Sequence, residues 1–155
     1  VYSPGHMGHS PGQTMIVRTW CRGDTEAVEL QSAQQYLRCI VDVRADFTEL
    51  AEKGLVWTAE HDGAILGIAG VEPQWENRAT AFALLSDDSG PHFPAIHSAV
   101  VEFLDNAPYR RIEATVDVGF KQGHRWIKML GFELEGYMKA YRPDGADMLL
   151  YARIK

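Results

Sequence analysis

The stretch that most constrains the fold runs from residue 111 to residue 141. Apolar residues first alternate with polar ones, as in a half-buried strand: Ile112, Ala114 and Val116. Small or apolar residues then recur at helical spacing: Gly123, Trp126, Ile127 and Leu130. Asp117 is suited to cap this helix and Gly131 to end it, and residues 132–135 begin a new extended run. The stretch therefore predicts a strand, a helix and a second strand.

Length and charge exclude several classes of protein. A chain of 155 residues is long enough for one domain with a sizeable core. The formal net charge of −6 argues against a nucleic-acid partner held by phosphate contacts. No apolar run has the length needed to cross a bilayer, so we expect neither a membrane protein nor a membrane partner. These features favour a cytoplasmic protein.

Cysteine and histidine suggest no metal or redox site. Cys21 and Cys39 match no metal or redox spacing, and two free thiols are expected in a reducing compartment. His92 and His97 are five residues apart and would not share a helix face.

Turn-forming residues divide the chain. Residues 1–14 are rich in Gly, Pro, His and Ser without periodicity, and we interpret them as a tag or linker, disordered or extended, before a single domain at 15–155. The expected elements of that domain follow in order: a strand at 15–20, one long or two short helices at 24–41, a short helix at 47–51, strands at 55–60 and 64–71 around an Asp-Gly turn, a break at 73–77, a strand at 79–85, a loop at 86–91, a helix to 104, the 111–135 unit, and a hairpin of 136–141 and 148–154.

This order, together with the run LGFELEG at residues 130–136, resembles the GNAT superfamily of N-acetyltransferases. The resemblance implies an α/β (α+β) fold with a mixed central sheet of about six to seven strands, flanked by helices and splayed between its central parallel strands. The run at residues 110–153 resembles the C-terminal half of acetyltransferase-like proteins encoded by tailed phages. An unrelated small α/β binding protein remains the alternative.

The resemblance also implies acetyl-CoA as cofactor. In the family, backbone N–H groups polarise the thioester where two strands diverge; here these would be Leu84, Leu85 and Ser86, opposite residues 114–115. The pyrophosphate would meet the loop at residues 86–92 through Ser89, Gly90 and His92. The family pattern Gln/Arg-x-x-Gly-x-Gly/Ala is kept only at Gly90. The acidic Asp87 and Asp88, together with Pro91, count against tight binding.

The following helix departs from the family as well. Phe120, Gly123 and Ile127 stand where the family has Asn, Ala and Tyr, and they would line the cofactor. Because the Tyr that protonates the leaving thiolate is absent, His124 is a candidate substitute. Tyr137 is a second candidate acid or a pocket wall. Plain packing or exposure is the alternative for both residues.

For the base, the family often uses a Glu near the central strands. Glu72 and Glu76, on either side of Trp75, are the candidates, although exposed carboxylates at a strand end are usually only solvated.

The prediction is therefore an N-acetyltransferase that moves an acetyl group from acetyl-CoA to a small-molecule or protein amine by direct attack in a ternary complex. A homodimer would fit this class as well. The alternative is a degenerate GNAT-fold accessory module without turnover. Transferase activity requires that the strands be separated at residues 84–86 and 114–116; paired strands or side chains that plug the gap would count against it.

Overall fold

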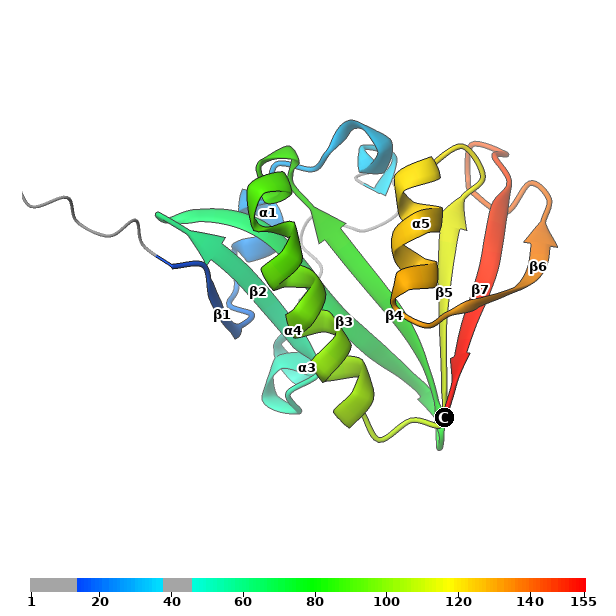
Figure 1. The fold of residues 1–155 in the computed structure, drawn as a ribbon, viewed down its shortest axis with the longest axis horizontal. Coiled ribbons are helices and arrows are strands. Elements are labelled where there is room, and N and C mark those ends of the chain that lie inside the picture. Colours follow the sequence, from blue (N-terminus) through cyan, green and yellow to red (C-terminus); the bar gives the residue numbers. More distant parts are fainter. Residues whose placement is uncertain (1–13, 38–45) are drawn as a thin grey trace, which may run out of the picture.

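The structure, a computed structural model, describes residues 14–37 and 46–155. Seven strands form one mixed sheet in the order β1-β2-β3-β4-β5-β7-β6 (Figure 1). The strands are β1 (Ile16–Thr19), β2 (Val56–His61), β3 (Ala64–Trp75), β4 (Arg78–Leu85), β5 (Arg111–Asp117), β6 (Glu133–Met138) and β7 (Met148–Ile154). The helices are α1 (Asp24–Ala27), α3 (Thr48–Glu52), α4 (Phe93–Asn106) and α5 (Lys121–Met129), with 3₁₀ turns η1 (Ser32–Gln34) and η2 (Asp87–His92). The predicted fold class is confirmed.

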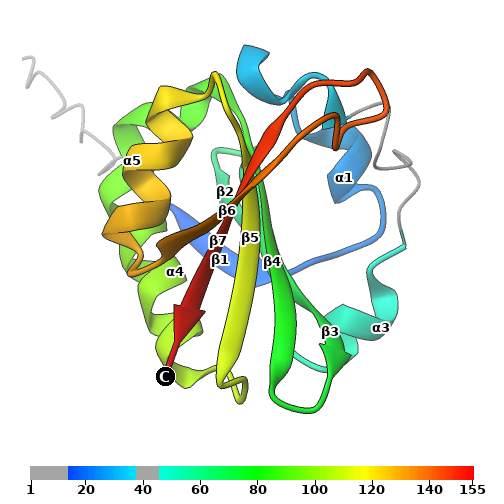
Figure 2. The same ribbon diagram turned by 90° about the vertical axis from the view of Figure 1, so that its right-hand side faces the viewer.

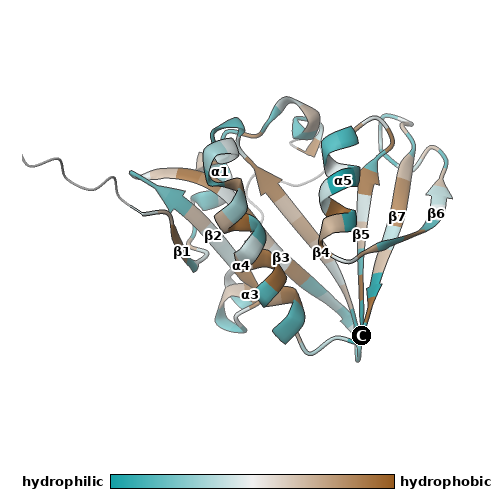
Figure 3. Cartoon of the chain, in the orientation of Figure 1, coloured by the Kyte–Doolittle hydropathy of each residue, from teal (hydrophilic) through white to brown (hydrophobic). Residues whose placement is uncertain are grey.

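Helices cover both faces of the sheet. Figure 2 shows α4 and α5 on one face and α1 and α3 on the other. The core under α4 and α5 includes the buried residues Val71, Ala79, Leu104, Ile112, Ile127 and Tyr151. The core under α1 and α3 is made by Trp20, Val28, Leu30, Val56, Ile68 and Leu84. Hydrophobic residues follow the central strands β4 and β5, whereas the edge strand β6 is mostly hydrophilic (Figure 3).

The central pair, β4 and β5, separates after three residues. Within the described sheet it is the one parallel pair, and it is paired only at Arg78↔Arg111, Ala79↔Ile112 and Thr80↔Glu113. Beyond this point each strand keeps its other neighbour, since β4 stays paired with β3 to Leu85 and β5 with β7 to Asp117. The strands therefore diverge as predicted, and Figure 1 shows the opening between them.

For residues 24–41 the sequence predicts one long helix or two short ones, and the single long helix is wrong. α1 ends at Ala27 and the chain then runs extended until η1. The cause is tertiary: Val28 and Leu30, two residues apart, both enter the core, and Leu30 forms an antiparallel bridge with Ser86. The rest of the predicted segment, residues 38–45, lies outside the described residues.

The predicted break at residues 73–77 is confirmed at 76–77 and wrong at 73–75, which belong to β3. β3 continues to Trp75, with an irregularity between Pro73 and Trp75, and Asn77 supplies the positive φ of 66° in a tight turn. The backbone amide of Ser86 donates to Leu66 O. Because hydrogen-bonded pairs alternate along an antiparallel ladder, the even-numbered residues of β3 and β4 direct their peptide groups at one another. The nitrogen of Pro73, an odd-numbered residue, therefore points away from β4. It points to the side where β2 has already ended, so the absence of its N–H breaks no hydrogen bond of the sheet.

Candidate active site

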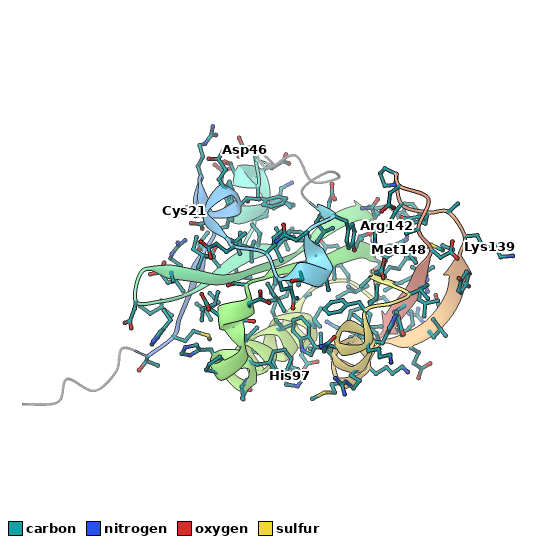
Figure 4. The ribbon with its side chains drawn as sticks, turned by 90° about the horizontal axis from the view of Figure 1, so that it is seen from above. Cys21, Asp46, His97, Lys139, Arg142 and Met148 are labelled. Atoms are coloured by element: carbon teal, nitrogen blue, oxygen red, sulfur yellow. The ribbon has the colours of Figure 1, made fainter. Side chains whose placement is uncertain are left out.

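A cavity of about 930 Å³ includes the opening between β4 and β5 and extends toward β1 and β2, where Val17 and Ala59 line it. That volume is in the range of small-molecule sites. On the α4 and α5 face its walls include Gly67, Ala69, Ala81, Ala83, Val100 and Ile127. It also reaches the other face, where Gln31, Gln34, Tyr36 and Phe82 line it. Figure 4 shows His97 on the α4 side of the sheet and Arg142 on the other side. The cavity thus gives access from two directions to one sheet opening.

The structure brings seven of the predicted cofactor residues together around this cavity: Leu85, Ser86, Ser89, Gly90, Phe120, Gly123 and Ile127. Leu84 and His92 do not line it. The side chain of Leu84 enters the core under α1 instead. The ring of His92 lies 4.3 Å from the ring of His61, centroid to centroid.

The backbone donors predicted for the thioester all have protein partners. The amide of Ser86 donates to Leu66 O at 2.9 Å, and by the alternation of an antiparallel ladder the amide of Leu84 also faces β3. The amide of Leu85 faces the opening but donates to Gln34 Oε1 at 2.8 Å. By the same alternation the amide of Ala83 faces the opening, and sequence reasoning missed this residue.

The β4 edge is covered by the segment 30–34. Gln34 Nε2 donates to Ala83 O at 2.7 Å, and the backbone amide of Gln31 donates to Leu85 O at 2.9 Å. Gln31 Nε2 in turn donates to Gln34 Oε1 at 3.0 Å. No sequence signal marks this contact, because it depends on a bridge between distant segments.

The loop after β4 offers few free donors for a phosphate. In η2 the amide of Asp88 donates to Ser86 Oγ at 3.2 Å and the amide of Ser89 to Ser86 O at 3.1 Å. Pro91 and Pro94 have no N–H, and the exposed carboxylates of residues 87 and 88 stand beside the same helix start. This end of the site is weakly built for an anion.

Two aromatic side chains join α4 to α5 at the cavity wall. The rings of Phe93 and Trp126 are 5.3 Å apart in an edge contact, and Trp126 Nε1 donates to His97 Nδ1 at 3.1 Å. Beside them Gly123 packs closely, since an added Cβ would lie 2.9 Å from Val116 Cγ1. A glycine is needed here for α5 to approach β5.

Neither candidate acid lines the cavity. His124 Nδ1 is 2.8 Å from the hydroxyl of Tyr151, and its Nε2 donates to Val118 O at 3.1 Å. Burial raises the pKa of Tyr151. Tyr137 lies exposed on β6, where its hydroxyl donates to Asp147, and this hydrogen bond raises the pKa of Tyr137.

The candidate bases Glu72 and Glu76 also lie outside the cavity lining, and both are exposed. Glu72 pairs with Thr80, the last β4 residue before the opening, and therefore lies on the face of β4 that carries Phe82. Glu76 lies one turn further away, in the β3–β4 connection.

A carboxylate that the sequence did not single out, Glu113, stands at the point of separation. Its side chain is 12% exposed and accepts from Arg78 Nη2 at 2.7 Å and Arg111 Nε at 2.6 Å. The hydrogen bond from Arg78 is the main cause that lowers the pKa of Glu113, which makes this group a poor proton acceptor. Its role is to bind β4 to β5 where they are still paired.

The described residues contain no group of three or more His, Cys, Asp or Glu side chains that could hold a metal ion. Cys21 is an exposed free thiol, and Cys39 lies outside the described part of the chain. The longest described helix, α4, has 14 residues, and none of the described helices combines the length and apolar character that spanning a bilayer requires.

Comparisons with known proteins match the fold but not the sequence. No protein-family model matches the chain, and no curated protein matches its sequence. Among solved structures, a ribosomal-protein-alanine N-acetyltransferase from Brucella melitensis superposes with a TM-score of 0.72 at 16% identity, over 90% of this chain and 99% of the other. A GNAT-family acetyltransferase from Bacillus anthracis gives 0.62 at 17% identity, over 92% and 96%. Salmonella typhimurium yncA, a proposed acetyltransferase solved with its cofactor acetyl-CoA, gives 0.70 at 12% identity, over 92% and 94%. The fold of this chain is therefore the GNAT acetyltransferase fold.

Proposed function

We propose that this chain transfers an acetyl group from acetyl-CoA to an amine. The observation that carries the proposal is the cavity of about 930 Å³ that includes the opening of β4 and β5. Beside β4 its walls include the small residues Gly67, Ala69, Ala81 and Ala83, which leave room for the extended pantetheine arm. The edge of β4 that faces the opening has peptide groups that could bond to the arm's amides once Gln34 is displaced. Acetyl-CoA would supply the acyl group as a thioester. The residues present fit this arm.

The chain's own groups have separate tasks in this proposal. The amide of Ala83 is the donor for the thioester oxygen, because it faces the opening from β4. Gly123 and Ile127 hold the arm from α5, and Ser89 and Gly90 meet the phosphates. Since residues 87 and 88 are acidic, we expect modest affinity at the phosphate end.

The acceptor amine must lose a proton before or during attack. Glu72 is the better candidate base, because it stands beside the last paired row of β4 on the face opposite α4 and α5, and it would act through water. Glu76 is further along the same hairpin. His124 and Tyr137 remain candidate acids only if they exchange their present partners, Tyr151 and Asp147.

The proposal is tested first by binding. Acetyl-CoA at 100 times its Kd should stabilise the fold by about 2.7 kcal/mol, or about 5–10 °C in melting temperature. Thiol release with a panel of small amines and N-terminal peptides then tests turnover. Glu72→Gln should slow release about 100-fold, whereas Glu76→Gln serves as the matched control on the same hairpin. No melting shift at any concentration contradicts the proposal.

The second candidate is a binding module that holds acyl-CoA without turnover. Two observations favour it: the β4 edge is covered by Gln34, and none of the candidate bases and acids Glu72, Glu76, His124 and Tyr137 lines the cavity. In this form the chain would act as an accessory module of the kind that tailed phages encode. A melting shift with acetyl-CoA, but no thiol release with any amine, would favour it.

A further inference from the structure

We infer that residues 30–34, here called the glutamine strap, compete with the pantetheine arm for the open edge of β4 and so set the affinity for acyl-CoA. This inference depends on the proposed function, since it concerns how the same opening admits its ligand. It adds a conformational step that the fold alone does not require.

The strap replaces a missing strand. After Thr80, β5 no longer pairs with β4, so the peptide groups of Ala83 and Leu85 that face β5 need other partners. The side-chain amide of Gln34 supplies both a donor and an acceptor, in the way a peptide group of a neighbouring strand would. Because Ala83 O can only accept and Leu85 N–H can only donate, the orientation of this amide is fixed by its partners.

The arm and the strap need the same atoms. An arm whose thioester oxygen accepts from the Ala83 N–H, and whose amides continue along the β4 edge, meets Ala83 O, Leu85 N–H and Leu85 O next. The side chain of Gln34 bonds to Ala83 O and to Leu85 N–H, and the backbone amide of Gln31 bonds to Leu85 O. Both glutamines also line the cavity that the arm would enter. Binding of the arm at this edge therefore requires release of Gln34.

The strap is held in a way that allows release. Its anchor is apolar, because Leu30 is 6% exposed in the core under α1. By contrast no residue of η1 is buried, and Gln34 itself is half-buried. The hydrogen bonds that would be broken are between neutral groups, each with a modest net value because water replaces the lost partner. Leu30 can stay in place while residues 32–34 move.

The experiment compares acetyl-CoA binding by isothermal titration calorimetry in the wild type, Gln34→Ala and Gln34→Met. The methionine variant keeps the size of the side chain but removes both hydrogen bonds to β4. We expect both variants to bind about tenfold more tightly, because the closed form loses two neutral hydrogen bonds. Gln74→Ala is the matched control, since Gln74 is exposed on β3 and its side chain bonds only Glu72 O, at 3.4 Å. Its affinity should equal that of the wild type.

Hydrogen exchange of the Leu85 amide gives a readout that does not depend on ligand. It should accelerate in both Gln34 variants and not in Gln74→Ala. Equal or weaker acetyl-CoA binding by the Gln34 variants overturns the strap's role and leaves the acyl-CoA site standing. Failure of every variant to bind acetyl-CoA overturns the proposed function, and the strap's role with it.

Discussion

Gly70→Ala is the substitution whose cost follows most directly from the structure. Gly70 lies in β3, paired with Val56 of β2 and Phe82 of β4. A Cβ added there would lie 2.5 Å from Leu55 O, 3.0 Å from Phe82 Cζ and 3.1 Å from Val56 Cα. Two of these atoms belong to backbone in the middle of the sheet, so the strands must shift. Overpacking of this kind costs about 1–3 kcal/mol, and a cost of about 2 kcal/mol lowers the melting temperature by about 4–8 °C.

The control is Gly136→Ala on the edge strand β6. Neither of these two glycines has a positive φ, but a Cβ on Gly136 would meet only Leu150 Cβ, at an ordinary 4.0 Å. That variant should equal the wild type or gain up to about 1 kcal/mol from a less flexible unfolded chain. Both are measured by thermal and urea denaturation. If Gly70→Ala is as stable as Gly136→Ala, the close approach of β2 and β3 described here is wrong.

Three further predictions concern charge. Because Arg78 holds the pKa of Glu113 below its usual 4.5, the carboxylate's contribution to stability is present above that pH and is lost as pH falls below it. The melting temperature of Glu113→Gln should therefore lie furthest below that of the wild type at pH 7 and approach it as pH falls below 4.5; a difference that does not change with pH would contradict this. Asp24→Asn should cost about 3 kcal/mol in urea denaturation, since the buried carboxylate accepts from Arg18, the Cys21 amide and Thr58, and equal stability would contradict this. The double variant Asp87→Asn/Asp88→Asn should bind acetyl-CoA about threefold more tightly at low salt, with the gain lost at 0.5 M salt; an unchanged affinity would place the phosphates elsewhere.

The strand and helix order could be predicted because each of those elements carries its own period. The alternation of Ile112, Ala114 and Val116 is that of β5, and all three residues are buried there. Gly67 and Gly70 of β3 are both positions of close backbone approach, since an added Cβ would lie 3.1 Å from Leu84 O and 2.5 Å from Leu55 O respectively. The long helix failed because two periods overlap: Leu30, Ala33 and Leu37 fit a helical spacing, whereas Val28 and Leu30 fit an extended one, and the bridge from Leu30 to Ser86 decides between them.

The candidate site was predictable where it is made of backbone and small residues, and less so where it depends on partners. Leu85, Gly123 and Ile127 line the cavity because the divergence of β4 and β5 follows from the fold. The positions of Gln34 and Glu113 could not be predicted, because each depends on a partner at least 35 residues away. The spacing of residues within one segment does not reveal contacts between segments that lie so far apart in the sequence.

A crystal structure of the chain grown with coenzyme A tests whether the opening between β4 and β5 receives the arm of an acyl-CoA. We expect the arm between the two strands, its amides bonded to Ala83 and Leu85, and Gln34 turned away from both. Coenzyme A bound elsewhere on the surface, or an opening still closed by Gln34 at saturating coenzyme A, would contradict it.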